Sequence, residues 1–148
     1  MESAFKFIKD NGGITTDANY PYKGNDGTCN KKKSANMAAR IIGFTRLPAN
    51  NEIRLQEAIA RQPISVAIDA AGYEFQFYSK GVFAGPCGND LNHAVAIVGY
   101  GGDSKSKYWT VKNSWSKGWG ETGYMRMKRN VPSREGLRGI AMQASYPN

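Results

Sequence analysis

Two segments of the chain decide its fold, LNHAVAIVGYG at residues 91–101 and YWTVKNSW at residues 108–115. Their β-branched and aromatic content predicts strands at 94–100 and 108–112, and the glycines between them predict a turn. Two antiparallel strands joined by such a turn bring the start of the first close to the end of the second. We therefore expect the side chains of His93 and Asn113 to be hydrogen-bonded neighbours.

His93 is the only histidine in the chain, so any imidazole base must be this residue. An asparagine oxygen that accepts a hydrogen bond from one ring nitrogen orients the ring and leaves the other nitrogen facing a reaction partner. Trp115 would shield that hydrogen bond from water and strengthen it. Taken alone, each residue has a commoner explanation. A single histidine beside an apolar run is more often a core or strand-end residue, and an isolated asparagine is more often part of a turn.

The composition excludes several other classes of function. In 148 residues, 41% are apolar and 11% aromatic, which fits one ordinary globular domain, and no apolar run approaches the ~18 residues of a membrane span. The net charge is +8, but the only dense basic run is Lys31-Lys32-Lys33, which is more consistent with a solvated loop than with nucleic-acid binding. One histidine and two distant cysteines cannot supply a four-ligand zinc site. We expect no metal, cofactor, nucleic acid or membrane partner.

The rest of the chain predicts one helix and a long loop, followed by mixed elements. Apolar residues at helical spacing predict a helix at 1–9, which begins without a capping residue, as though the chain started within an element. The predicted elements that follow are a loop at 14–36, a strand at 39–44, a helix capped by Asn50-Asn51 and ended by Pro63, a strand at 64–68, an aromatic turn at 73–78 and a strand at 124–128. The second half therefore favours an antiparallel sheet or partial barrel with one flanking helix.

Longer motifs resemble those of the papain-like cysteine proteases. The segments NSW at 113–115 and GWGETGYMR at 118–126 resemble the asparagine signature of that family, and NHAV at 92–95 resembles its histidine signature. Further similar segments, in the same order, are YPY at 20–22, QPISV at 62–66, GPCG at 85–88 and ASYP at 144–147. The resemblance spans essentially the whole chain and is greatest to the plant vacuolar or secreted members.

The resemblance implies an α+β fold with one helical domain, one antiparallel β-barrel domain and a cleft between them. Residues 1–43 would be a remnant of the helical domain, and residues 44–148 would form the β-barrel domain, with a tail returning to the helical side. The implied activity is that of a cysteine endopeptidase in which a Cys–His–Asn set hydrolyses peptide bonds. His93 would act as base and then acid, Asn113 would orient it, and Trp115 and Asn92 would support the site.

The same resemblance implies that the nucleophile is absent from residues 1–148. Family spacing places the catalytic cysteine about 130 residues before the histidine and about 150 before the asparagine, which is roughly 37 residues before Met1. This chain would then supply only the histidine and the asparagine. The alternative, from a different class, is a catalytically inactive truncated pseudo-protease that binds peptides or a partner protein.

The two cysteines, by resemblance, belong to structural bridges. The partner of Cys87 would lie in the string Gly-Leu-Cys-Gly-Ile, which reads GLRGI at 136–140 here, so Arg138 occupies the partner's place. The partner of Cys29 would lie in the absent segment. Both are predicted to be free thiols unless they meet each other or a second chain. Ser116 is a further departure, since the family usually has glycine after the tryptophan.

The substrate pocket implied by the resemblance takes an apolar side chain two residues before the cut. Its walls would be Met1, Ala67, Leu91 and Ala94, with Gln143 at its base, although Ala67 and Leu91 also fit an ordinary core. The implied partners are peptide or protein substrates and cystatin-type inhibitors. The exposed apolar face of the first helix favours self-association. The family's location implies a vacuolar, lysosomal or extracellular protein, although the N-terminus carries no signal-peptide pattern.

Overall fold

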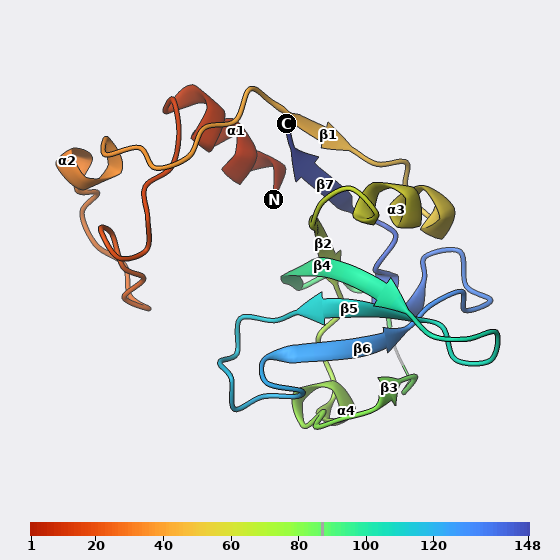
Figure 1. The fold of residues 1–148 in the computed structure, drawn as a ribbon. Coiled ribbons are helices and arrows are strands. Elements are labelled where there is room, and N and C mark those ends of the chain that lie inside the picture. The colour runs from red at the N-terminus through yellow and green to blue at the C-terminus, as the bar shows by residue number, and fades with distance from the viewer. Residues whose placement is uncertain (87) are drawn as a thin grey trace. The chain divides into compact units, whose positions relative to one another are not determined.

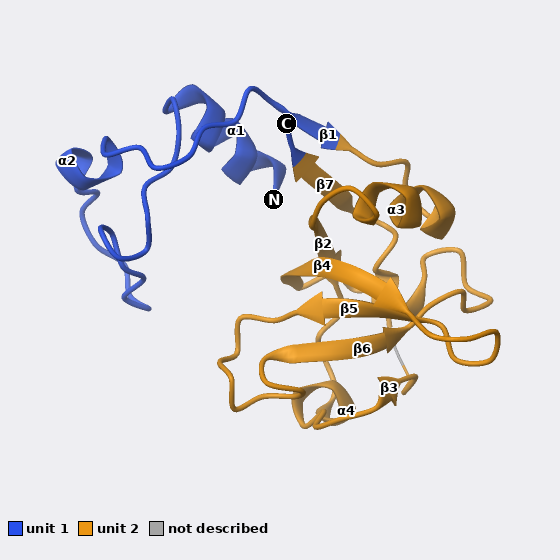
Figure 2. Cartoon of the chain, in the orientation of Figure 1, with its two compact units in different colours: residues 1–45, 147–148 blue, residues 46–146 orange. Residues whose placement is uncertain are grey.

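The computed structural model describes residues 1–86 and 88–148, which divide into two compact units. One unit comprises residues 1–45 and 147–148, and the other comprises residues 46–146 (Figure 2). The assignment of residues 1–43 to a helical domain and of 44–148 to a β-barrel domain remains a prediction.

The smaller unit contains two helices and long irregular segments. Helix α1 spans Glu2–Asp10, and Met1 at its start makes no side-chain cap, as the sequence predicted. Phe5 of α1 stacks on Phe44, with ring centroids 5.9 Å apart. The short helix α2, Lys31–Ser34, is capped by the Asn30 side chain, which accepts from the Lys33 N–H. The lysine run predicted as loop is therefore one helical turn.

The strand predicted at residues 39–44 is wrong. The structure has only an isolated bridge between Ile14 and Ala39, and strand β1 begins later, spanning Phe44–Arg46. The β-branched residues Ile41 and Ile42 produced the local strand pattern. A strand also needs a continuous partner, and the backbone hydrogen bonds of this segment go to two different places: Ala39 pairs with Ile14, whereas the Ile42 N–H donates to the Asn148 carbonyl over 2.8 Å.

The larger unit is built on a mainly antiparallel sheet (Figure 1). Its strands are β2 (Ile64–Ile68), β3 (Val82–Phe83), β4 (His93–Gly101), β5 (Tyr108–Lys112), β6 (Tyr124–Lys128) and β7 (Ala144–Pro147), the last of which reaches the boundary of the unit. Within the unit their order is β7-β2-β4-β5-β6-β3, and only the β3–β6 pair is parallel. The predicted strands at 64–68, 94–100, 108–112 and 124–128 are all present. The short strands β3 and β7 were not predicted.

Three short helices complete this unit, namely α3 (Glu52–Ile59), α4 (Tyr73–Gln76) and the 3-10 turn η1 (Leu137–Gly139). Asn51 caps α3 as expected, because its side chain accepts from the Arg54 N–H over 3.0 Å. Leu55 and Ile59 of α3 are buried, whereas Ile53 is 73% exposed. The core consists of side chains from α3, η1 and the strands. Trp109 of β5 is fully buried in it.

Candidate active site

The candidate site lies where β4 begins and β5 ends. His93 is the first residue of β4, and Asn113 directly follows the last residue of β5. The two strands pair antiparallel, with Ala96 opposite Lys112, so their ends meet at one edge. Nε2 of His93 lies 2.8 Å from Oδ1 of Asn113, the contact that the strand order led us to expect.

The surroundings of Asn113 determine which atom of its amide faces the histidine. Asn113 is 9% exposed, and its Oδ1 also accepts the backbone N–H of Ser114 over 2.7 Å. Because that N–H requires an acceptor, the oxygen is held toward His93, and Nε2 of the ring must donate to it. Nδ1 of His93 is then left as the nitrogen that can take up a proton. The Nδ2 group of Asn113 is buried without a hydrogen-bond partner among the described residues.

An aromatic cluster covers one face of the histidine ring. Trp115 stacks on His93, with centroids 5.1 Å apart and planes at 27°. Trp119 and Phe75 pack edge-on against Trp115, at 5.4 and 5.6 Å. Trp119 is itself fixed by a hydrogen bond from Nε1 to the carbonyl of Gln76 over 2.8 Å. The cluster limits access of water to the His93–Asn113 hydrogen bond, which strengthens it.

Asn92 holds the start of β4 against the end of β2. Its N–H donates to the Ile68 carbonyl over 3.1 Å, and its Oδ1 accepts the Ala70 N–H over 2.9 Å. Its Nδ2 lies 3.4 Å from Oδ1 of Asp69. Asn92 thus acts on the position of His93 through the backbone. Its role in catalysis, like that of Trp115, remains a prediction.

Asp69 was missed in the sequence, although a carboxylate directly after the apolar strand at 64–68 was a signal for a special position. It is 5% exposed, and 3.9 Å separates its Oδ1 from Nη1 of the buried Arg138. In the sequence, Arg138 is identifiable only as a replacement for a cysteine. Asp69 of this pair faces Asn92, in the same unit as the histidine.

The five residues predicted to line a substrate pocket are only partly brought together. Ala67 and Ala94 face each other directly in the β2–β4 pair. The Ala67 N–H donates to the Gln143 carbonyl over 3.1 Å, so the Gln143 backbone lies beside β2. Leu91 lies against Gly139, where an added Cβ would come within 2.8 Å of its Cδ2. Met1 belongs to the other unit, so the pocket as a whole remains a prediction.

A hollow of about 450 Å³ adjoins the aromatic cluster. Gln76, Phe77, Tyr78 and Ser79 line one part of it, and Trp115, Gly118, Trp119 and Gly120 line the other. Trp115 is the residue that this hollow shares with the stack on His93.

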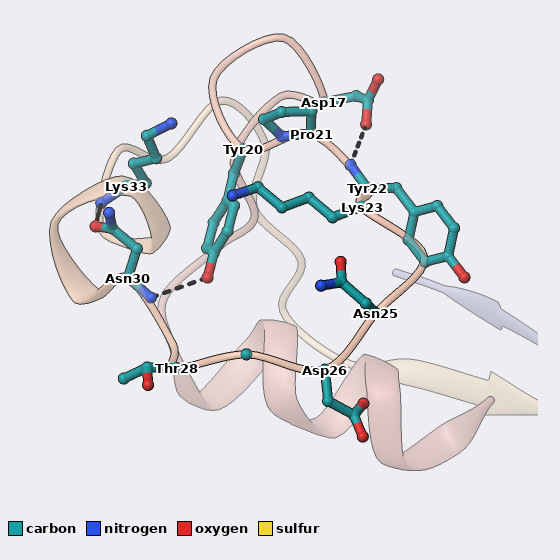
Figure 3. Close-up of a pocket in the computed structure, with 11 residues that line it drawn as sticks. Asp17, Tyr20, Pro21, Tyr22, Lys23, Asn25, Asp26, Thr28, Asn30 and Lys33 are labelled. Carbon is teal, nitrogen blue, oxygen red and sulfur yellow. Dashed lines mark hydrogen bonds between the residues drawn. The ribbon is translucent and has the colours of Figure 1, made fainter.

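A second hollow, of about 690 Å³, lies in the smaller unit and contains none of the predicted site residues (Figure 3). Its walls come from the loop at 17–30 and from Lys33. Tyr20 shapes it, because its hydroxyl accepts the Asn30 N–H over 2.9 Å, and Asp17 accepts the Tyr22 N–H over 3.3 Å.

The cysteine and the potential metal ligands of the described residues form no further centre. Cys29 is exposed and free. Cys87, predicted to be a structural free thiol, lies outside the described residues. Among residues 1–86 and 88–148, no three histidine, cysteine or carboxylate side chains gather as a metal site would require. No helix in the same ranges is long and apolar enough to cross a membrane.

Comparison with known proteins gives the family of this chain. Residues 1–148 match the family described as papain family cysteine protease. Vignain of Phaseolus vulgaris is 59% identical over 148 residues, covering 99% of this chain and 41% of that protein. A KDEL-tailed cysteine endopeptidase, CEP2, of Arabidopsis thaliana is 54% identical over 147 residues, with 99% and 41% covered. The bromelain protease of Ananas comosus, solved with the inhibitor E64, superposes with a TM-score of 0.93 at 51% identity, covering 99% of this chain and 68% of that one.

The chain therefore belongs to the papain family of cysteine proteases. Its fold is papain-like, as the sequence predicted, and the predicted α+β class is confirmed. The chain spans about two-fifths of the length of these curated relatives, 41% in both cases.

Proposed function

We propose that residues 1–148 supply the histidine and asparagine of a papain-like cysteine endopeptidase, and that the nucleophilic thiol comes from outside these residues. The observation that carries this proposal is the 2.8 Å contact between Nε2 of His93 and Oδ1 of Asn113, beneath the stacked Trp115. It fixes the ring so that Nδ1 is available to a thiol. Family membership supports the same chemistry.

In the proposed reaction, Nδ1 of His93 takes the proton of the thiol, and the resulting imidazolium stabilises the thiolate. The thiolate attacks the peptide carbonyl, and the C–N bond breaks as Nδ1 returns the proton to the leaving amine. A water molecule then attacks the thioester, with Nδ1 accepting its proton, and the acid product and the free thiol are regenerated. Asn113 keeps the ring in place throughout, since it binds the nitrogen that does not react.

Peptides or proteins with an apolar residue two positions before the cut are the proposed substrates. The pairing of two small side chains, Ala67 of β2 and Ala94 of β4, supports this proposal. Cystatin-type inhibitors are proposed as partners, and the complex of bromelain with E64 supports inhibitor binding at a site of this family. For location we propose the vacuole or lysosome, or the extracellular space. A related protease described as KDEL-tailed supports passage through the secretory route.

The second candidate is a pseudo-protease that binds peptides without cutting them. The departure at Arg138, where the resemblance implies a cysteine, favours it. The two functions are separated by a chimera in which the segment of vignain that precedes the matched residues, where we expect the nucleophilic cysteine, is joined to Met1. We expect this chimera to hydrolyse a short peptide at pH 5–7, and both His93→Ala and Asn113→Ala to impair it. Peptide binding with no turnover in a folded chimera would support the pseudo-protease instead.

The 148-residue chain alone should show no peptidase activity at pH 5–7, since the remaining base has no thiol to activate. The decisive controls are His93→Ala and Cys87→Ser. Turnover that survives both changes indicates a contaminating protease. Turnover abolished by either change would show that this chain supplies its own nucleophile and would contradict the proposal.

A further inference from the structure

Arg138 is a buried cation that the proposed reaction does not use. It is 2% exposed and lies in the 3-10 turn η1, with φ at 55°, a left-handed conformation that non-glycine residues rarely adopt. Such a conformation persists only where surrounding contacts hold the residue in place. By resemblance, its position is that of a bridging cysteine, so a different kind of link is expected there.

The guanidinium of Arg138 joins two separate segments of the chain. Nη1 donates to the carbonyls of Asp69 and Ala71, over 2.8 and 2.6 Å, just past the end of β2. Nη2 donates to the carbonyl of Pro86 over 3.1 Å. The backbone of Arg138 takes part as well, because its carbonyl accepts the Asp69 N–H over 2.9 Å. The forked guanidinium therefore ties η1 to the end of β2 and to the loop at residue 86.

A series of polar contacts connects Arg138 to the histidine. The Asp69 carboxylate lies 3.9 Å from Nη1, and its Oδ1 accepts the Ala71 N–H over 2.9 Å and faces Nδ2 of Asn92. Asn92 precedes His93 directly and is bound to Ala70 and Ile68. A change in the position of Asp69 would therefore reach the first residue of β4.

A series of aromatic contacts also connects Arg138 to the ring of His93. The guanidinium carbon of Arg138 lies 5.1 Å from the centroid of Phe75. Phe75 packs edge-on against Trp115, and Trp115 stacks on His93. Arg138 therefore contacts one member of each group that supports the histidine: Asp69, which faces Asn92, and Phe75, which packs on Trp115.

We propose that Arg138 is a positioning residue for the His93–Asn113 pair and fulfils, through hydrogen bonds, the linking role that a disulfide would have there. This inference rests on the proposed function for its catalytic meaning. Its structural content, that Arg138 keeps Nε2 of His93 on Oδ1 of Asn113, holds or fails independently of peptidase activity.

The test uses the single histidine of the 148-residue chain, uniformly labelled with ¹⁵N and carrying no histidine tag. The ¹⁵N shifts of the two ring nitrogens report which one carries the proton, so the tautomer is measured without turnover. In the wild-type chain we expect the Nε2–H tautomer, with slow exchange of that proton. In Arg138→Met, which keeps the length of the side chain but no donor, we expect a mixture of tautomers and loss of the slow exchange.

Two further variants separate positioning from general stability. Arg138→Lys keeps the charge but not the fork, so its spectrum should lie between those of the wild type and Arg138→Met. Arg129→Met is the matched control, because Arg129 is also buried, at 7% exposed, and also lies over aromatic rings, those of Tyr100 and Trp109. We expect this control to lower the thermal transition while leaving the His93 tautomer unchanged.

An unaltered tautomer and exchange rate in a folded Arg138→Met chain would overturn the proposal. Equal disturbance of the histidine in Arg129→Met would also overturn it, since the effect would then be one of overall stability. If neither Arg138 variant folds, Arg138 is a residue required for folding and the positioning role is rejected. If the Nε2–H tautomer is found in the wild-type chain and lost in Arg138→Met, but the wild-type chimera is inactive, the proposed function is rejected and this inference is not.

Discussion

Oδ1 of Asn113 accepts two hydrogen bonds, from Nε2 of His93 at 2.8 Å and from the Ser114 N–H at 2.7 Å, while Nδ2 of the same amide is buried without a partner among the described residues. The asparagine therefore contributes its oxygen alone. The backbone N–H of Ser114 holds that oxygen in place, and the oxygen determines which nitrogen of His93 is free to react.

The first prediction concerns this oxygen. Asn113→Ala in the vignain chimera removes the acceptor, so the ring loses its fixed orientation. We expect kcat/KM to fall by roughly 10²-fold, at the low end of what general acid–base catalysis contributes. Asn25→Ala, at an exposed loop position, is the control and should leave kcat/KM unchanged. A folded Asn113→Ala chimera with undiminished kcat/KM would show that the hydrogen bond has no part in the reaction.

The second prediction concerns the ring over the histidine. Trp115→Ala removes the stacked indole and its contacts with Phe75 and Trp119, so water reaches the His93–Asn113 hydrogen bond. We expect a loss of about 2 kcal/mol in the free energy of unfolding, less than for a fully buried tryptophan, and faster exchange of the Nε2 proton. Urea unfolding and NMR measure the two effects. Trp115→Phe, which can still stack, should show less of both, and equal losses in the two variants would count against a role for stacking.

The third prediction is a pH dependence from the pair Glu121–Arg126. The hydrogen bonds from the Arg126 guanidinium lower the pKa of Glu121, with a further contribution from the Gly81 N–H. Because the folded-state pKa is below the unfolded value of 4.5, the stabilisation is fully present above 4.5 and is lost as the pH falls through the lowered pKa.

Glu121→Gln should therefore lower the Tm at pH 7 by about 2 °C, a small effect because both side chains are partly exposed to solvent. The difference from the wild type should vanish in strong acid, below the lowered pKa. Scanning calorimetry from pH 7 to about pH 2 measures it. A difference of the same size at every pH would mean that packing, and not charge, explains the effect.

The fourth prediction concerns self-association of the 148-residue chain. Helix α1 has no buried residue, and Phe7 is 59% exposed, which leaves an apolar surface beside an exposed free thiol at Cys29. We expect dimers or larger species in sedimentation, reduced by Phe7→Ser and by reductant. Ile53→Lys is the control, since Ile53 is also exposed on a helix. A monomer with a cooperative transition above ~60 °C, unaffected by reductant, would contradict this prediction.

Much of the fold could be predicted because its signals are local. The strands at 64–68, 94–100, 108–112 and 124–128 alternate in burial or carry β-branched residues, and glycine-rich turns separate several of them. The proximity of His93 and Asn113 followed from two neighbouring antiparallel strands, which needed no knowledge of the rest of the chain. Where a local pattern lacked a partner strand, as at 39–44, the prediction was wrong.

The family, the strands that carry the histidine and the asparagine, and their meeting at one edge of the sheet could all be predicted, because each depends on motifs and on residues close along the chain. The orientation of the Asn113 amide, the stacking of Trp115 and the contacts of Arg138 with the carbonyls of Asp69, Ala71 and Pro86 could be found only in the folded chain. These contacts join segments more than fifty residues apart or depend on side-chain direction, and a long-range contact forms only where the packed core brings its two groups together.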